Sequence, residues 1–257
     1  MLSPQQINDF IELGYIKVEN AFSKSLAKEC CDILWAKTGF DKFDHRTWNS
    51  PVVRIGDLTD DCFVDAANSP KILKTLNTIA GDNWIPRKSL GTFPLRFPHS
   101  EEPKDTGWHV DASFPGDDPN DFMSWRINVA SQGRALLMLF LFSDVSENDA
   151  PTRLAVGSHK DVARLLHPHR REGLTFMELA AQLESTDLSR EAIATGPAGT
   201  VYLCHPFLAH AAQPHRGIHP RFMAQPPLLS QRPFKVDRKS EASNLIEKAI
   251  ISALSEV

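Results

Sequence analysis

The stretch Ala135-Leu-Leu-Met-Leu-Phe-Leu-Phe142 is apolar at every position and is followed by the polar pair Ser143-Asp144. Successive side chains of a strand point to opposite faces of a sheet, so a strand of this composition is covered on both faces. An apolar run without a period also fits a buried helix, and the pattern alone leaves both interpretations open. We expect a buried strand here.

Shorter apolar segments and capped helices surround this run. From about residue 85 the chain is rich in Pro and Gly, and further strands are expected at 152–156, 199–208 and 220–224. Ser and Thr caps and closing glycines predict helices at 3–14, 23–37, 69–81 and 175–184, an amphipathic pattern predicts one at 240–256, and a strand is expected at 15–18. Helices followed by many short strands predict a mainly β fold with flanking helices, with a jelly-roll or sandwich core.

The composition excludes several classes of protein. The chain has 257 residues, and its net charge of −4 without a basic block gives no reason to expect a nucleic acid or an anionic membrane as partner. Its longest apolar run is much shorter than the ~20 residues of a membrane span. The four cysteines lack CxxC spacing, and the N-terminus lacks the order of a signal peptide. We expect a cytoplasmic protein with a small-molecule partner.

The chain carries no internal repeat, low-complexity tract or long linker, so we expect a single domain over 1–257. Within it, a helical N-terminal part at 1–82 is expected to pack on a β core at about 85–236. The helix at 240–256 then closes the chain.

The main candidate for chemistry is Gly107-Trp-His-Val-Asp111. In a strand, residues i and i+2 project from the same face, so His109 and Asp111 would aim an imidazole and a carboxylate at one point. Two histidines and one carboxylate hold iron(II) on one face and leave its other positions free. The H-x-[DE] tripeptide by itself is weak evidence, because it occurs three times in this chain.

The other two matches have simpler interpretations. His99-Ser-Glu101 lies in a polar stretch flanked by prolines. His159-Lys-Asp161 precedes an apolar helical pattern, so Asp161 is expected to cap a helix.

A third ligand is available about a hundred residues later. His205 and His210 both lie on an expected strand, and a straight strand would point them to opposite faces unless Pro206 breaks the register. Further on, Arg221 begins another expected strand. A buried guanidinium binds both oxygens of a carboxylate at once and stays charged, so iron together with this arginine suggests 2-oxoglutarate.

These residues resemble the phytanoyl-CoA dioxygenase family of iron(II)/2-oxoglutarate oxygenases. The resemblance runs from the N-terminal Ser3-Pro-Gln-Gln segment through Trp108-His-Val-Asp111 and Gly157-Ser-His159 to His210 and Arg221. It implies that His109, Asp111 and His210 bind the metal, and that Arg221, eleven residues after His210, binds 2-oxoglutarate. It also implies a double-stranded β-helix, which is a variant of the jelly roll.

Two features of the chain refine this expectation. Some relatives place Ser or Thr two residues after the distal histidine as a second anchor for 2-oxoglutarate, whereas this chain has Ala212. Thr152 is our candidate for that anchor, with Gln132 and Arg134 as alternatives. Related halogenases carry a small residue where Asp111 stands, so hydroxylation is expected rather than halogenation.

The predicted function is therefore that of an Fe(II)- and 2-oxoglutarate-dependent dioxygenase. It would use O2 to hydroxylate a small organic molecule and would convert 2-oxoglutarate to succinate. The alternative is a non-catalytic jelly-roll protein that binds a metal or a carboxylate. The aromatic-rich segment 112–125, directly after a predicted ligand, is expected to be a lid or a packed surface loop.

Overall fold

Antiparallel sheets form the core of the protein in a computed structural model that describes residues 2–237 and 241–255. The largest sheet has the order β1-β9-β5-β11, and β12 also pairs with β5. Its strands are β1 (Tyr15–Val18), β5 (Leu136–Leu141), β9 (Val201–Cys204), β11 (Met223–Ala224) and β12 (Pro227–Leu228). The second sheet consists of β10 (His210–Ala211), β6 (Arg153–Ala155) and β8 (Glu191–Ile193).

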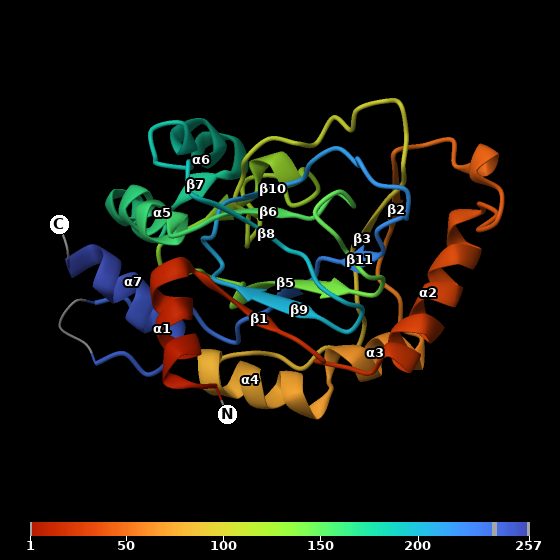
Figure 1. Cartoon of the computed structure of the whole chain (residues 1–257). Helices are drawn as coiled ribbons and strands as arrows, with labels where there is room; N and C mark the ends of the chain where they lie inside the picture. The colour runs from red at the N-terminus through yellow and green to blue at the C-terminus, as the bar shows by residue number, and fades with distance from the viewer. Residues whose placement is uncertain (1, 238–240, 256–257) are drawn as a thin grey trace.

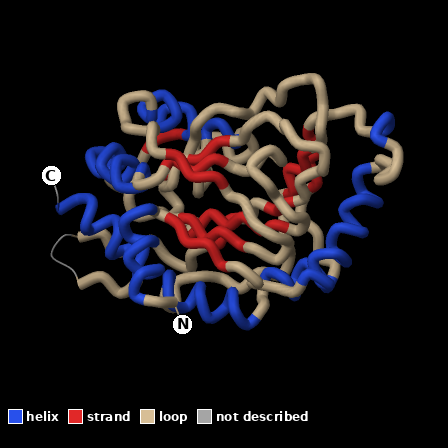
Figure 2. Tube along the Cα trace, in the orientation of Figure 1, coloured by secondary structure: helices blue, strands red, loops and turns tan. Residues whose placement is uncertain are grey.

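Two strand pairs complete the β structure. One joins β2 (Val52–Ile55) to β3 (Phe93–Arg96), and the other joins β4 (Arg126–Ile127) to β7 (Leu174–Thr175). Figure 2 shows the strands gathered in the interior and the helices around them.

Strand β5 confirms the prediction from its unbroken apolar run. Leu137 and Leu139 belong to a cluster that includes Leu154 of β6, so this face of β5 packs toward the second sheet. Met138 and Phe140 belong to the larger cluster that includes residues of the helices. Both faces of β5 are therefore buried, and this explains why neither parity of the run is polar.

Seven α-helices are present among the described residues: α1 (Pro4–Leu13), α2 (Lys24–Thr38), α3 (Asp61–Ala67), α4 (Pro70–Ala80), α5 (Ser158–Leu166), α6 (Phe176–Leu183) and α7 (Leu245–Ser255). Short 3-10 helices are η1 (His45–Thr47), η2 (Phe122–Ser124) and η3 (His167–His169). Helices α1, α4 and α7 lie along the outer side of the largest sheet (Figure 1). No helix in the described ranges has the length and apolarity needed to cross a bilayer.

The predicted helix caps at Ser3 and Thr175 are confirmed. Each forms a capping box, in which its side-chain oxygen accepts an N–H from the third residue of the helix while that residue's side chain accepts the N–H of the cap. Gly14 ends α1 with φ of 86°, a left-handed conformation that glycine adopts without steric cost.

Three helix predictions need correction. Helix α3 was missed because its seven residues are too few to show a helical period. Asp161 is not a cap: Gly157 is the N-cap of α5, and Asp161 lies in its first turn. The last helix begins at Leu245 rather than at 240, since Asn244 accepts the N–H of Glu247; positions 240 and 256 of the prediction lie outside the described residues.

The predicted strand at 199–208 is also wrong in its second half. Strand β9 ends at Cys204, and the N–H of Leu208 donates to the carbonyl of His205 in a turn. The chain then joins the second sheet as β10. The N-terminal part is not purely helical, because it supplies β1 to the largest sheet and the unpredicted strand β2 to the pair with β3.

Candidate active site

His109, Asp111 and His210 lie together at the edge of the second sheet. His109 and His210 exchange two backbone hydrogen bonds, with N···O distances of 3.0 and 2.9 Å, so residues a hundred positions apart are directly opposite each other. The prediction placed His109 and Asp111 in a regular strand. They lie instead in a segment outside any strand, with this single bridge. Their i and i+2 spacing still directs both side chains toward His210.

The three side chains direct one ligand atom each to a common point. Oδ1 of Asp111 lies 3.9 Å from Nε2 of His109 and 3.9 Å from Nε2 of His210. The two imidazole rings are 4.4 Å apart between centroids. Among the described residues this is the only group of at least three His, Cys, Asp or Glu side chains with converging ligand atoms.

The backbone sets which nitrogen of each histidine is available. Nδ1 of His109 lies 3.0 Å from the carbonyl of Gly107, and Nδ1 of His210 lies 3.1 Å from the carbonyl of Leu208. A carbonyl only accepts, so each Nδ1 is assigned the proton and each Nε2 presents its lone pair. Burial lowers the pKa of His210 to about 4, which keeps this imidazole neutral at physiological pH.

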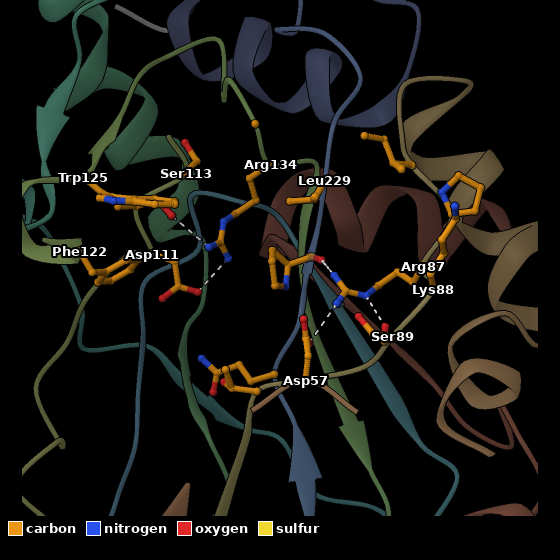
Figure 3. Close-up of a pocket in the computed structure, with 18 residues that line it drawn as sticks. Asp57, Arg87, Lys88, Ser89, Asp111, Ser113, Phe122, Trp125, Arg134 and Leu229 are labelled. Carbon is orange, nitrogen blue, oxygen red and sulfur yellow. Dashed lines mark hydrogen bonds and ion pairs between the residues drawn. The ribbon is translucent and has the colours of Figure 1, made fainter. Parts of the chain in front are cut away.

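Arg134 holds the carboxylate of Asp111 and was not predicted to do so. Its Nη1 donates to Oδ2 of Asp111 at 2.9 Å and its Nη2 donates to the carbonyl of Ala112 at 3.0 Å (Figure 3). Burial alone would raise the pKa of Asp111, but Arg134 and the two histidines together lower it. The arginine thus occupies Oδ2 and leaves Oδ1 facing the histidines. Sequence gave no signal for this pairing, because Arg134 precedes β5 in a turn.

A cavity of about 290 Å³ adjoins the three side chains, and Arg221 lines it. Arg221 is 1% exposed; its two Nη atoms donate to the carbonyls of Ala150 and Pro94, and its Nε has no hydrogen-bond partner among the described residues. Thr152 lines the same cavity, and its hydroxyl lies 3.8 Å from the sulfur of Met223.

Arg96 is a second buried arginine in this cavity, and sequence reasoning missed it. Its backbone bridges that of Arg221, so the two side chains share one face. Nη2 of Arg96 donates to both oxygens of Asp105, at 2.8 and 2.9 Å, while its Nε and Nη1 have no partner within the described part of the chain. The position of Arg96 in β3 would have indicated a residue of this cavity only if its pairing with Arg221 had been known.

The electrostatics of this cavity fit an anion. Burial, together with the nearby charge of Arg96, lowers the pKa of Arg221. Enclosed donors without partners are costly, and an enclosed excess of positive charge is costlier still. A carboxylate bound between the two guanidinium groups would relieve both costs.

His205, the alternative third ligand, lies elsewhere. It is fully buried on the other side of the turn, where its ring is 4.9 Å from that of His159 and 5.1 Å from that of Phe207. The turn after β9 therefore separates His205 from His210, and only His210 joins Asp111.

The residues present fit a metal and a dicarboxylate. Two neutral imidazoles and one carboxylate are the ligand set for iron(II) that leaves open positions. Arg96 and Arg221, which keep buried donors without a partner in the described part of the chain, line the cavity next to that set. Nitrogen and oxygen ligands of this kind suit a metal that must also bind an oxo acid.

The expected lid is a loop at the mouth of the site. The N–H of Phe114 pairs with the carbonyl of Arg126, and the reciprocal bond closes the segment between them into a hairpin-like loop. Phe122 in η2 is 44% exposed and lines the cavity with the three candidate ligands.

Known structures share this fold. Over 95% of this chain and 94% of the other, the structure is similar to HygX from Streptomyces hygroscopicus with nickel, 2-oxoglutarate and hygromycin B bound, with a TM-score of 0.59 and 16% identity. The epimerase SnoN in complex with Fe3+, alpha ketoglutarate and nogalamycin RO matches with a TM-score of 0.56 and 16% identity, over 88% of this chain and 82% of SnoN. The carbocyclase SnoK from nogalamycin biosynthesis matches with a TM-score of 0.55 and 15% identity, over 89% and 84%.

The family comparison agrees with the site. No curated protein matches the chain in the sequence search. The model of the family described as "Phytanoyl-CoA dioxygenase (PhyH)" matches residues 11–223, which include His109, Asp111, His210 and Arg221. The expected cofactors, Fe(II), 2-oxoglutarate and O2, are those of this family. The chain belongs to the phytanoyl-CoA dioxygenase (PhyH) family.

Proposed function

We propose that the protein is an Fe(II)- and 2-oxoglutarate-dependent dioxygenase that hydroxylates a small organic molecule and converts 2-oxoglutarate to succinate. The observation that carries this proposal is the convergence of His109, Asp111 and His210 beside a cavity lined by two buried arginines, each with at least one guanidinium nitrogen that has no hydrogen-bond partner among the described residues. HygX and SnoN, which share the fold, were crystallised with a metal and this cosubstrate.

Each residue has a defined task in this proposal. His109, Asp111 and His210 would hold iron(II), and Arg134 orients Asp111 so that Oδ1 faces the histidines. Arg221 and Arg96 would bind the remote carboxylate of 2-oxoglutarate, with Thr152 on the wall of the same cavity. When bound, iron(II) and 2-oxoglutarate supply the oxidising chemistry with O2. Phe122 lines the loop side of the same cavity.

Three further expectations belong to this proposal. The largest sheet and the second sheet, packed through Leu139 and Leu154, would form the double-stranded β-helix core of a single domain. Asp111 supports hydroxylation over halogen transfer, because a carboxylate held by Arg134 occupies the position that a halide would need. The four cysteines are free thiols, which fits a reducing compartment such as the cytoplasm.

The first test is spectroscopic. Iron(II) and 2-oxoglutarate, added without O2, should produce a weak visible charge-transfer band, because the oxo acid would chelate the metal. The absence of the band would contradict the proposal. Succinate formation stimulated by a substrate would then distinguish a dioxygenase from a binding protein.

The second test concerns the two arginines. Arg96→Gln should weaken 2-oxoglutarate binding about tenfold, measured from the charge-transfer band, because one charge-assisted contact is lost. Arg221→Gln should weaken it further, because Asp105 already neutralises Arg96, whereas Arg221 contacts only backbone carbonyls. Arg46→Gln, an exposed arginine paired with Asp44, is the matched control and should leave the affinity unchanged. Equal affinities in all four proteins would remove the assignment.

A further inference from the structure

A second cavity, of about 710 Å³, opens onto the candidate metal site from another direction. It shares Thr92, Asp111, Phe122 and Gln225 with the cavity of the two arginines, so the two spaces meet beside Asp111. Arg96 and Arg221 line only the smaller one. If the smaller cavity takes 2-oxoglutarate, as proposed above, the larger one is where the molecule to be oxidised can reach the metal.

One wall of the larger cavity is aromatic. Figure 3 shows Phe122 and Trp125 beside Asp111, and their rings are 5.7 Å apart between centroids. The indole N–H of Trp125 donates to the carbonyl of Pro119 at 2.9 Å, which fixes the plane of the ring. Phe122 is 44% exposed and lines the cavity, so its ring is accessible to a bound molecule. This wall suits a flat or cyclic apolar group.

The opposite wall is cationic. Figure 3 shows Arg87 and Lys88 across the cavity from Asp111, with Asp57 near Arg87. The backbone orients Arg87, since its Nε donates to the carbonyl of Ser89 at 2.9 Å and its Nη1 to the carbonyl of Pro227 at 2.6 Å. A guanidinium held in this way is a preorganised receptor for a carboxylate.

The neighbouring acid does not saturate these cations. Nη2 of Arg87 lies 3.6 Å from Oδ1 of Asp57, beyond hydrogen-bond distance, and the side chain of Asp57 is 60% exposed. Lys88 is exposed at the rim and has no ion-pair partner among the described side chains. Asp111, the other acid of the cavity, is already bound to Arg134. Two cations thus face one weakly held carboxylate.

We propose that this cavity is the substrate site and that the substrate is a ring-containing organic acid. Its carboxylate binds Arg87 and Lys88, and its ring lies on Phe122 and Trp125 near the metal. The carbon that is oxidised is therefore remote from the acid group. This inference rests on the proposed function, because only a metal at His109, Asp111 and His210 makes the larger cavity a place of reaction.

The test uses matched probes on the full chain loaded with iron(II) and saturating 2-oxoglutarate without O2. The probes are phenylacetate and 2-naphthylacetate, the two corresponding amides, and 2-phenylethylamine. Binding is measured by calorimetry and by the change in the charge-transfer band. At least one acid should bind about tenfold more tightly than its amide, and the amine should bind more weakly than either.

Variants then locate the preference. Arg87→Gln and, separately, the exposed Lys88→Gln should each reduce the ratio of acid to amide affinity to less than threefold. Trp125→Leu should weaken the acid and its amide by the same factor, because only the ring contact is lost. Lys24→Gln, an exposed lysine at the start of α2 outside the cavity, is the matched control and should keep the wild-type ratio.

The outcomes separate the two proposals. If the band forms but amides or the amine bind as tightly as the acids, or no probe binds, the substrate class is wrong while the proposed function stands. If the band does not form, the proposed function fails. In that case, calorimetry on the metal-free protein still measures whether the acids bind more tightly than the amides and the amine. If they do, and if Lys88→Gln abolishes the difference, the cavity is a binding site for organic acids without a role in oxidation.

Discussion

Among the described residues, two pairs of histidine rings lie close together, and only one pair has a carboxylate whose oxygen converges with its ring nitrogens. The rings of His109 and His210 are 4.4 Å apart, and those of His159 and His205 are 4.9 Å apart. Asp111 adds a carboxylate to the first pair and two cavities adjoin it. The proximity of two imidazoles is therefore not what distinguishes the site.

The second pair belongs to the core beneath the helices. Nε2 of His159 lies 3.0 Å from the carbonyl of Ile11, and the ring of His205 packs against Phe10 and Phe207. A Cβ on Gly14 would lie 2.5 Å from Nδ1 of His159, so the chain passes close to this ring. What differs between the pairs is a third ligand and open space, which are what a metal with free coordination positions needs.

The largest expected effect comes from removing one histidine of each pair. His210→Ala should lower the affinity for iron(II) by more than about 100-fold, because a direct ligand is lost. His205→Ala should retain metal binding, although it should lower the melting temperature by leaving a cavity in the core. Metal binding is measured by anaerobic calorimetry and folding by circular dichroism. Metal loss in a folded His205→Ala protein would erase the contrast between the pairs.

The carboxylate and its support can be tested next. Arg134→Gln should weaken iron(II) binding about 10- to 100-fold, the usual cost of losing a partner that orients a ligand. Arg134→Lys should not restore the affinity fully, since an ammonium cannot bind Asp111 and the carbonyl of Ala112 in the same fork geometry. Calorimetry with the folded variants gives the comparison. Wild-type affinity in Arg134→Gln would mean that Asp111 needs no support.

The second pair should be visible in the pH dependence of stability. Burial lowers the pKa of His159 to about 4, below the ~6.5 of the unfolded chain. Between these values the unfolded chain binds more protons, so the free energy of unfolding should fall as the pH decreases from about 6.5 to about 4. At pH 5, His159 lowers the free energy of unfolding by about 2 kcal/mol relative to its value well above pH 6.5.

Denaturant unfolding at pH 7 and pH 5 measures this dependence. His159→Gln should reduce the difference between the two pH values, whatever its effect on stability at pH 7. The charged neighbours of His159 include Glu12, Lys160 and Arg164, and the variant leaves them in place. An unchanged pH dependence would show that His159 does not titrate as its burial requires.

The smallest expected effect concerns the cavity beside the first pair. Ala212 lines the smaller cavity together with Thr152 and Arg221, but its side chain carries no polar atom. Ala212→Ser should increase the affinity for 2-oxoglutarate about three- to tenfold, the net value of one typical added hydrogen bond. Titration of the charge-transfer band measures it. Weaker binding would indicate that Thr152 already supplies this contact and that the new hydroxyl only crowds it.

Local features of the sequence predicted local features of the structure. Capping residues such as Ser3 and Thr175 act on N–H groups three positions away, and the paired apolar faces of 135–142 follow from side-chain alternation. The separation of His109 and Asp111 by one residue is local as well. The family resemblance added His210 and Arg221 to this pair, because it includes the separation of eleven residues between them, which no rule of local structure predicts.

Long-range pairing could not be predicted from those rules. Arg96 lines the cavity of Arg221 because the two residues are bridged across 125 positions of chain, and Arg134 reaches Asp111 from a turn before β5. Arg87 faces Asp111 across the larger cavity in the same way. No periodicity or cap indicates such contacts, since they depend on how separate segments pack.

Local sequence features were enough to predict where α1, α2, α4 and α6 begin, which strand is covered on both faces, and which tripeptide presents an imidazole and a carboxylate on the same side. These properties depend on backbone geometry over a few residues. The residues alone left His205 and His210 open, and the family resemblance favoured His210, which the structure places beside Asp111. The contact of Arg134 with Asp111 came from the tertiary structure alone. A single turn after Cys204 separates the two histidines, so that His205 lies in the core while His210 lies in the second sheet. Charges enclosed far from water must find partners wherever the fold brings them.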